Sequence, residues 1–196
     1  MENVKRDPTA YVGLKEREDI PNNAFNLSGL DHCGIPAKDP DLAGQFIEQI
    51  LGGIECYRAG YSDGDREMGR LRHRFYHVGS QLIEVVEQED GMSYPHKTNP
   101  ASENTNPHWA FGTDISGLKS FVEHLSAEKI PFDGPRSHKG TSVVSVYFRD
   151  PDGNNLEVTT WGDDLQGLET TEMGGEHGFI PWPDLTHEWR PRRTEK

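Results

Sequence analysis

The spacing of apolar residues predicts two amphipathic helices in the chain. In the first, Leu42, Phe46 and Ile50 fall on one helical face. Asp39 followed by proline is a typical helix start, and Gly52 is a typical residue at a helix end. The second helix has an equivalent apolar face, formed by Leu118, Val122 and Leu125. We expect Asp114 or Ser116 to cap this second helix, which should end before Pro131.

Short segments with apolar residues at alternating positions predict strands around each helix. After the first helix they are residues 54–60, 70–79 and 81–88, and after the second they are residues 141–150 and 154–161. Another short apolar strand precedes each helix, and each of these carries a histidine, His32 or His108. Each half of the chain therefore has the order strand, helix and then a run of strands.

The two halves repeat the same register. Leu42 lies ten residues after His32, and Leu118 lies ten residues after His108. Glutamates stand at equivalent places on the last strands, Glu84 at 52 residues after His32 and Glu157 at 49 residues after His108. Such a fixed spacing is typical of an internal duplication.

The duplication predicts five segments: an N-terminal arm (1–26), a first module (27–90), a linker loop (91–106), a second module (107–162) and a C-terminal tail (163–196). Both ends are polar and irregular in pattern. The linker is rich in Pro, Asn and Ser, which favours a loop at the rim of a site. Trp182, Leu185 and Trp189 are expected to pin the tail onto the body or onto a second subunit.

Composition and charge narrow the classes of partner. The formal net charge of −13 argues against a nucleic-acid backbone or an anionic membrane surface. No stretch has the pattern of a signal peptide or the length of a membrane span, and two cysteines make no disulfide framework. We therefore expect a cytoplasmic protein.

The position of Glu157 between Leu156 and Val158 has two interpretations. By strand alternation alone, the carboxylate would face water. If the two modules pair their sheets around a shared hollow, His32, His108, Glu84 and Glu157 converge there instead. Two imidazoles with one or two carboxylates suit Fe(II), Mn(II), Ni(II), Co(II) or Zn(II), and two histidines with one carboxylate make a facial triad.

The paired units, the histidine on each first strand and the segment YFRDPDGNNLEV (147–158) resemble the vicinal oxygen chelate superfamily. That group includes glyoxalase I, methylmalonyl-CoA epimerase, fosfomycin-resistance transferases, bleomycin-resistance proteins and type I extradiol dioxygenases. The resemblance covers residues 27–162. It implies an α+β fold of two tandem βαβββ modules, whose curved sheets pair around one divalent metal ion held by His32, His108 and Glu157. Glu84 is a candidate fourth ligand.

Three more residues favour a ring-cleaving dioxygenase within that group. Tyr147 lies ten residues before Glu157, and His138 lies nineteen residues before it, in a predicted loop. His96 lies twelve residues before His108. In extradiol dioxygenases, residues near these spacings contact substrate oxygens and move protons. The resemblance thus implies an Fe(II) enzyme that acts on a catechol-like substrate with O₂.

Other functions stay open at this point. Glu84 favours a lyase or isomerase of the glyoxalase I or epimerase type, in which a carboxylate abstracts a proton beside a metal-polarised carbonyl. A thiol transferase would need a phosphonate signature that we do not find. A drug-binding protein without catalysis suits the acidic charge, but it has no need of convergent metal ligands. Homodimer formation is expected by analogy with paired modules.

Overall fold

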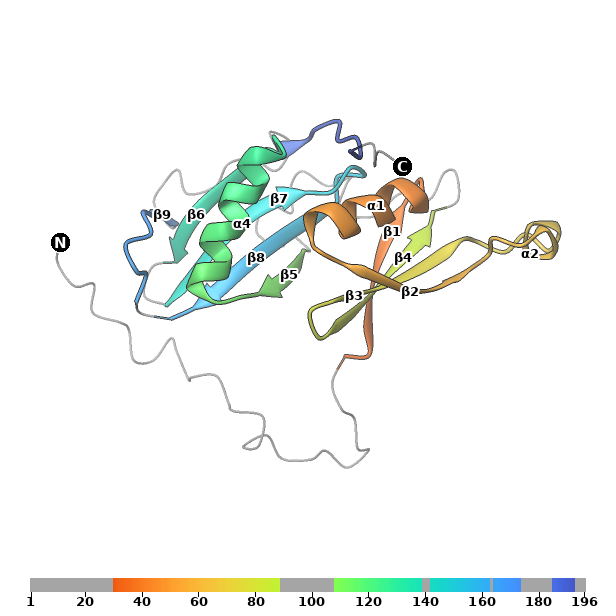
Figure 1. Cartoon of the computed structure of the whole chain (residues 1–196), viewed down its shortest axis with the longest axis horizontal. Helices are drawn as coiled ribbons and strands as arrows, with labels where there is room; N and C mark the ends of the chain where they lie inside the picture. Colours follow the sequence, from red (N-terminus) through yellow and green to blue (C-terminus); the bar gives the residue numbers. More distant parts are fainter. Residues whose placement is uncertain (1–29, 89–107, 139–141, 163, 174–184, 193–196) are drawn as a thin grey trace, which may run out of the picture.

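Two βαβββ modules follow one another along the chain, as predicted (Figure 1). The computed structural model describes residues 30–88, 108–138, 142–162, 164–173 and 185–192. The first module consists of β1 (His32–Ala37), α1 (Pro40–Ile50), β2 (Ile54–Ala59), the short helix α2 (Asp63–Glu67), β3 (His73–Val78) and β4 (Gln81–Glu87). The second consists of β5 (Trp109–Gly112), α4 (Ile115–Ala127), β6 (Phe132–His138), β7 (Val143–Arg149) and β8 (Asn155–Trp161). The α+β fold class is confirmed.

Each module forms one sheet with a helix packed on it. The first sheet has the order β1-β4-β3-β2, and the second has β5-β8-β7-β6 with a ninth strand, β9 (Thr171–Met173), beside β6. Helix α1 contacts β3 and β4, whereas α4 contacts β7 and β8. The apolar sides of both modules share one core, in which Phe46, Ile83, Leu118 and Val146 are almost fully buried.

Both helices begin where the sequence predicts. Asp39 is the N-cap of α1, and its side chain accepts a hydrogen bond from the backbone N–H of Asp41 at 3.0 Å. Of the two candidate caps for α4, the structure selects Asp114, whose carboxylate accepts from the N–H of Gly117 at 2.7 Å. These caps satisfy backbone donors that have no partner within the first helical turn.

Strand β6 corrects the sequence prediction, which placed His138 in a loop. The segment contains Gly134-Pro135 and other turn-forming residues, so it has no strand pattern. It forms a strand because it has a partner on each side, antiparallel β7 and parallel β9, and a register shift between Asp133 and Arg136 accommodates the irregularity. His138 therefore ends a strand. The presence of β9 also corrects the prediction of an irregular segment after residue 162.

The duplicated register is confirmed in the sheets. Strand β1 runs parallel to β4 with Gly34 opposite Glu84, and β5 runs parallel to β8 with Ala110 opposite Glu157. Because side chains alternate along a strand, His32, two residues before Gly34, shares the face of Glu84. The same relation places His108 on the face of Glu157. These faces are opposite to those covered by the helices, since Ile83, Val85, Leu156 and Val158 belong to the core.

The turn between β7 and β8 joins the two modules. Asp150 accepts a hydrogen bond from the N–H of Asn154 at 2.8 Å, and Gly153 has a φ of 82°, which favours glycine. The fully buried Asn154 side chain then donates to the carbonyl of Pro36 at the end of β1, at 2.9 Å. The motif DPDGNN thus acts as a link between modules as well as a turn.

The C-terminal segment also joins the modules. Trp189 is 7% exposed and packs edge-on against Phe46 of α1, with ring centroids 5.3 Å apart. Leu185 is buried against Tyr147 of β7. The prediction that Leu185 and Trp189 pin the tail to the body is confirmed, whereas Trp182 lies outside the described residues.

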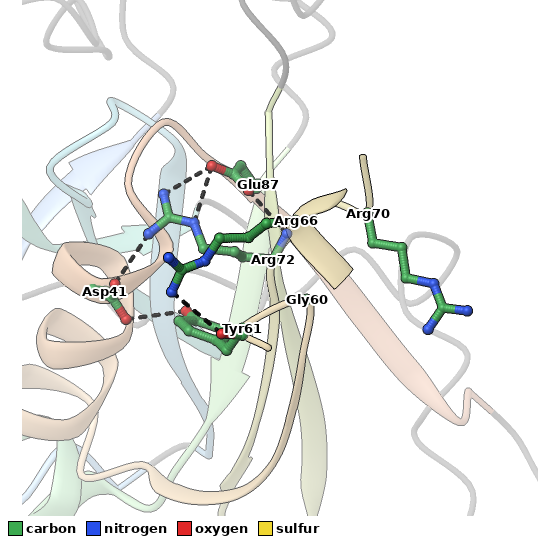
Figure 2. A pocket seen from close by; sticks show the side chains of 7 residues that line it. All are labelled: Asp41, Gly60, Tyr61, Arg66, Arg70, Arg72 and Glu87. Carbon is green, nitrogen blue, oxygen red and sulfur yellow. Dashed lines mark hydrogen bonds and ion pairs between the residues drawn. The ribbon is translucent and has the colours of Figure 1, made fainter. Parts of the chain in front are cut away.

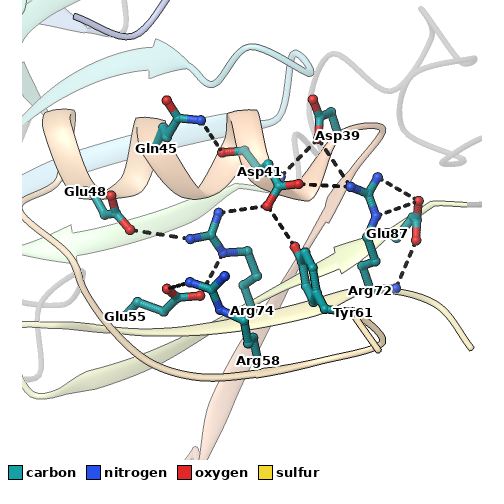
Figure 3. A network of polar contacts seen from close by, with 10 residues as sticks. All are labelled: Asp39, Asp41, Gln45, Glu48, Glu55, Arg58, Tyr61, Arg72, Arg74 and Glu87. Carbon is teal, nitrogen blue, oxygen red and sulfur yellow. Dashed lines mark hydrogen bonds and ion pairs between the residues drawn. The ribbon is translucent and has the colours of Figure 1, made fainter. Parts of the chain in front are cut away.

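A charged network fixes α1 to the first sheet on its helix-covered side (Figure 3). Its centre is Arg74, whose side chain is 8% exposed and donates to Glu55 at 2.8 Å and to Asp41 at 3.2 Å. Arg72 binds Glu87 through two nitrogens and also reaches Asp41 at 3.0 Å. Buried charge is tolerated here because each guanidinium is paired with carboxylates on neighbouring elements.

We expect Arg74→Ala to lower the free energy of unfolding by about 3 kcal/mol, because removing one member of a buried ionic network leaves the others desolvated and unpaired. Urea denaturation followed by circular dichroism measures this change. Arg66→Ala is the matched control, since its side chain is 70% exposed, and it should shift stability by less than about 0.5 kcal/mol. Equal losses in the two variants would contradict the assigned role of Arg74.

Candidate metal centre

The second module brings two of the predicted metal ligands into direct contact. His108 precedes β5 and Glu157 lies on β8, and the His108 Nε2 and Glu157 Oε2 atoms are 2.7 Å apart. The Glu157 side chain is 9% exposed, whereas that of His108 is 37% exposed. Glu157 therefore does not face open water, and the interpretation of it as a solvated strand carboxylate is wrong.

The surroundings of Glu157 keep it ionised. Burial raises the pKa of Glu157, but hydrogen bonds from His108 and Ser145 together with the charge of His108 outweigh it, so the pKa is lower than normal. A carboxylate held as the anion beside an imidazole is a suitable pair of donors for a divalent metal ion.

Tyr147 and His138 form a second pair on the same face of the sheet. The Tyr147 hydroxyl and His138 Nε2 are 3.1 Å apart and form a hydrogen bond, with the roles of donor and acceptor set by the histidine tautomer. Tyr147 lies opposite Glu157 in the β7–β8 register. Burial, and then the charge of Glu157, raise the pKa of Tyr147, while burial lowers the pKa of His138. The phenol therefore stays protonated near neutral pH.

The first module holds the other predicted donors. His32 Nε2 and Glu84 Oε2 are 3.5 Å apart, and the other oxygen of Glu84 lies 2.8 Å from Nδ1 of His73. Asp31 contacts His32 Nδ1 at 2.8 Å, and this hydrogen bond is the main reason that the pKa of His32 is raised. His32, His73 and Glu84 thus lie close together on the face of the first sheet that the helix does not cover.

His73 is a residue that the sequence analysis did not single out. Its proximity to Glu84 follows from the hairpin, in which Phe75 lies opposite Glu84 and His73 is two residues away on the same face. The alternation of His73, Phe75 and His77 along β3 was the signal that would have found it.

The described part of one chain does not bring the two sets of donors together. No group of three His, Cys, Asp or Glu side chains with metal-binding geometry occurs within it. The predicted ligand set of His32, His108 and Glu157 therefore stays a prediction, and each module holds part of it. The predicted acid–base residue His96 lies outside the described residues.

A separate hollow of about 350 Å³ lies at the helix-covered side of the first module (Figure 2). Three arginines line it, but Arg72 is already bound to Glu87 and Asp41, and Figure 2 shows Arg70 directed away from Arg72. Arg70 instead pairs with Asp65 at 3.0 Å. Because Arg70 points away and Arg72 is already paired, we assign this hollow to the structural network.

Comparison with known proteins agrees with the fold. The family model described as "Glyoxalase/Bleomycin resistance protein/Dioxygenase superfamily" matches residues 29–158, more than half of the chain. The chain belongs to this superfamily. The match starts before β1 and ends within β8, so it spans both βαβββ modules as far as Val158 and excludes the whole C-terminal tail (163–196).

Proteins that are similar to this chain include resistance and virulence proteins. The fosfomycin resistance protein FosX of Listeria innocua is 25% identical over 132 residues, which cover 67% of this chain and 89% of that protein. The virulence protein STM3117 of Salmonella typhimurium is 26% identical over 137 residues, covering 69% and 85%.

Solved structures show the same fold. The crystal structure of FosX from Listeria monocytogenes complexed with Mn(II) and sulfate has a TM-score of 0.51 and 20% identity, covering 71% of this chain and 96% of that one. A glyoxylase/bleomycin resistance protein/dioxygenase domain from Frankia sp. has a TM-score of 0.54 and 20% identity, covering 70% of this chain and 94% of that one.

In the described residues, we find no helix with the length and apolar character that crossing a membrane requires.

The lowered pKa of His138 predicts a pH-dependent loss of stability. Because its pKa in the folded protein is below the ordinary 6.5, the unfolded chain binds more protons there as the pH falls below 6.5. His138→Gln removes this contribution, which is worth up to about 1.4 kcal/mol per pH unit. Thermal unfolding at pH 7.5 and 5.5 should show a smaller decrease in stability for His138→Gln than for the wild type. The same change at exposed His77 is the control, and a decrease as large as the wild type's in His138→Gln would contradict the assignment.

Proposed function

We propose that the protein is a divalent-metal-dependent enzyme that binds a small substrate through adjacent oxygen atoms and adds water to an epoxide. The observation that carries the proposal is the close pair of His108 and Glu157, 2.7 Å apart, on the face that also presents Tyr147 and His138. Membership of the superfamily and the similarity to FosX support it.

The donors of the two modules fit a metal ion such as Mn(II) or Fe(II). His108 and Glu157 would bind it from the second module and His32 from the first, with Glu84 as a candidate fourth ligand. Two imidazoles and one carboxylate suit either ion, along with Ni(II), Co(II) or Zn(II), and they leave positions open for substrate oxygens. When bound, the ion would supply Lewis-acid activation of a substrate oxygen.

The similar structures favour an epoxide as substrate. One crystal structure of a FosX variant from Listeria monocytogenes contains Mn(II) and 1S,2S-dihydroxypropylphosphonic acid, and it has 22% identity to this chain and a TM-score of 0.53. That compound carries two adjacent hydroxyl groups, the arrangement that water addition to an epoxide produces. In this chain, the Tyr147 hydroxyl is suited to hold a proton near the substrate oxygen, and His138 is suited to orient that hydroxyl.

A ring-cleaving dioxygenase is the second candidate, because the Tyr147–His138 hydrogen bond places both predicted residues at one site. In this case the substrate would be catechol-like, with Fe(II) as the metal ion and O₂ as co-substrate. The same pair would then contact the substrate oxygens. The two candidates share the metal ligands and differ in their requirement for O₂.

We further propose that a second copy of the chain completes the site. The donors of the first module lie on a sheet face that also exposes apolar groups, among them Ile54 at 72% and Tyr57 at 61% exposure. An exposed apolar face of this kind is typical of a protein interface. If this face of the first sheet covers the His108–Glu157 face of another copy, His32 of one subunit lies beside His108 and Glu157 of the other.

Elemental analysis of protein purified anaerobically without chelators tests the metal site. We expect about one divalent ion per chain, and we expect Glu157→Ala to lose it because the site then keeps its imidazoles but loses the buried carboxylate of its second module. Glu123→Ala, a change at an exposed helix position, is the control. Absence of metal after reconstitution with each of the five ions would contradict the proposal.

The metal-loaded protein distinguishes the two candidate reactions. We expect fosfomycin or another small epoxide to gain one water with O₂ excluded, as detected by mass spectrometry. O₂ uptake with catechols on the Fe(II) form, without turnover of epoxides, would favour the dioxygenase instead. A loaded protein that converts neither class would contradict both candidates.

Mixing two inactive variants tests the shared site. His32→Ala and Glu157→Ala should each lose metal-dependent turnover, whereas a heterodimer of the two contains one intact set of ligands and one doubly altered set. Denaturing and refolding an equal mixture should therefore restore about a quarter of the wild-type activity, since half of the dimers are mixed and each has one intact site. No recovery would place all ligands within one chain.

A further inference from the structure

The C-terminal strap, residues 185–192, lies beyond the region shared with the superfamily, whose match ends at residue 158. Its side chains alternate between buried and exposed positions, with Leu185 and Trp189 at 4% and 7% exposure and the residues between them more open. A segment with this alternation packs one side on the body of the protein.

The strap is fixed at several points on both modules. His187 Nε2 donates to the carbonyl of Arg149 at the end of β7, at 2.9 Å. The backbone N–H of Arg192 donates to the Gln49 side chain at 3.0 Å, and its guanidinium pairs with Glu128 just after α4. With Trp189 in the core, these contacts leave the strap little freedom to move along the surface.

At the N-terminal end of the strap, Leu185 contacts Tyr147 of the candidate site. Leu185 and Tyr147 form an apolar cluster of their own, separate from the main core, and Tyr147 is 5% exposed. The ring of Tyr147 thus packs against Leu185, while its hydroxyl bonds to His138. A ring that is packed in this way has little room to turn, so its hydroxyl keeps its position relative to Glu157.

We propose that Leu185 is a positioning residue for Tyr147, so that the C-terminal strap sets how the site holds the oxygen of a chelating ligand. The proposal rests on the proposed function for the identity of the site. Under this proposal, a segment outside the superfamily match takes part in ligand binding. Leu185 acts through Tyr147 and does not itself contact the ligand.

A double-mutant cycle on the metal-loaded protein tests this coupling, with 4-nitrocatechol as the probe because its two adjacent oxygens chelate metal ions and its visible spectrum reports binding. Tyr147→Phe should weaken binding by about tenfold, the effect of one hydrogen bond to a charged ligand. Leu185→Ala should weaken it several-fold, and it should add nothing in the Tyr147→Phe background. Leu168→Ala, in the same C-terminal segment but packed on the main core, should leave binding unchanged.

Nitration of Tyr147 by tetranitromethane, followed by peptide mass spectrometry, gives a readout that needs no metal. Leu185→Ala should increase the nitration rate of Tyr147 by about tenfold, whereas Leu185→Met should keep it near the wild-type rate because the methionine refills the space. Unchanged nitration in Leu185→Ala, or a binding penalty that persists in Tyr147→Phe, would overturn the positioning role. Failure of the wild type to bind metal or 4-nitrocatechol would instead count against the proposed function, and the nitration result would still decide the position of the strap.

Discussion

The parallel pairing of the first and last strands in each module is the constraint on which the candidate site depends. In both modules this pairing places a histidine two residues before the partner of a glutamate, on the face away from the helix. The opposite face of the same strands belongs to the core, so a slip of one residue would turn the apolar side chains outward and the His and Glu inward. Core packing thereby fixes the register that brings the donors together.

That constraint explains why much of the fold and half of the site were predictable. The helices have caps and an apolar face, and the duplicated spacing together with the family resemblance places His108 and Glu157 at one site, where the structure brings them into contact. Strand β6 was missed because its stability comes from two neighbouring strands and leaves no pattern in its own residues. His73 was missed because its role depends on hairpin register, which a single strand does not reveal.

The distribution of the donors also explains why the sequence does not decide how the two sets of donors meet. Glu84 and Glu157 each hold a nearby histidine, so each module is locally satisfied without the other. The spacing along the chain indicates that these residues are equivalent. It does not indicate whether the donors of two modules meet within one chain or between two chains. The choice depends on which surfaces the linker and the shared core leave open, and those are tertiary properties.

The position of Trp189 has a consequence for how the protein is made. Gln49 and Arg192, which lie 143 residues apart in sequence, are joined through the strap, and Trp189 supplies part of the core beside Phe46. During synthesis, the first module emerges from the ribosome long before its share of this core arrives. The aromatic face of helix α1 therefore stays incompletely covered until the strap has been synthesised. Contacts between residues so far apart in sequence slow folding and prolong the time in which the chain can aggregate. The C-terminal strap thus makes completion of the fold a late event in the life of each new chain.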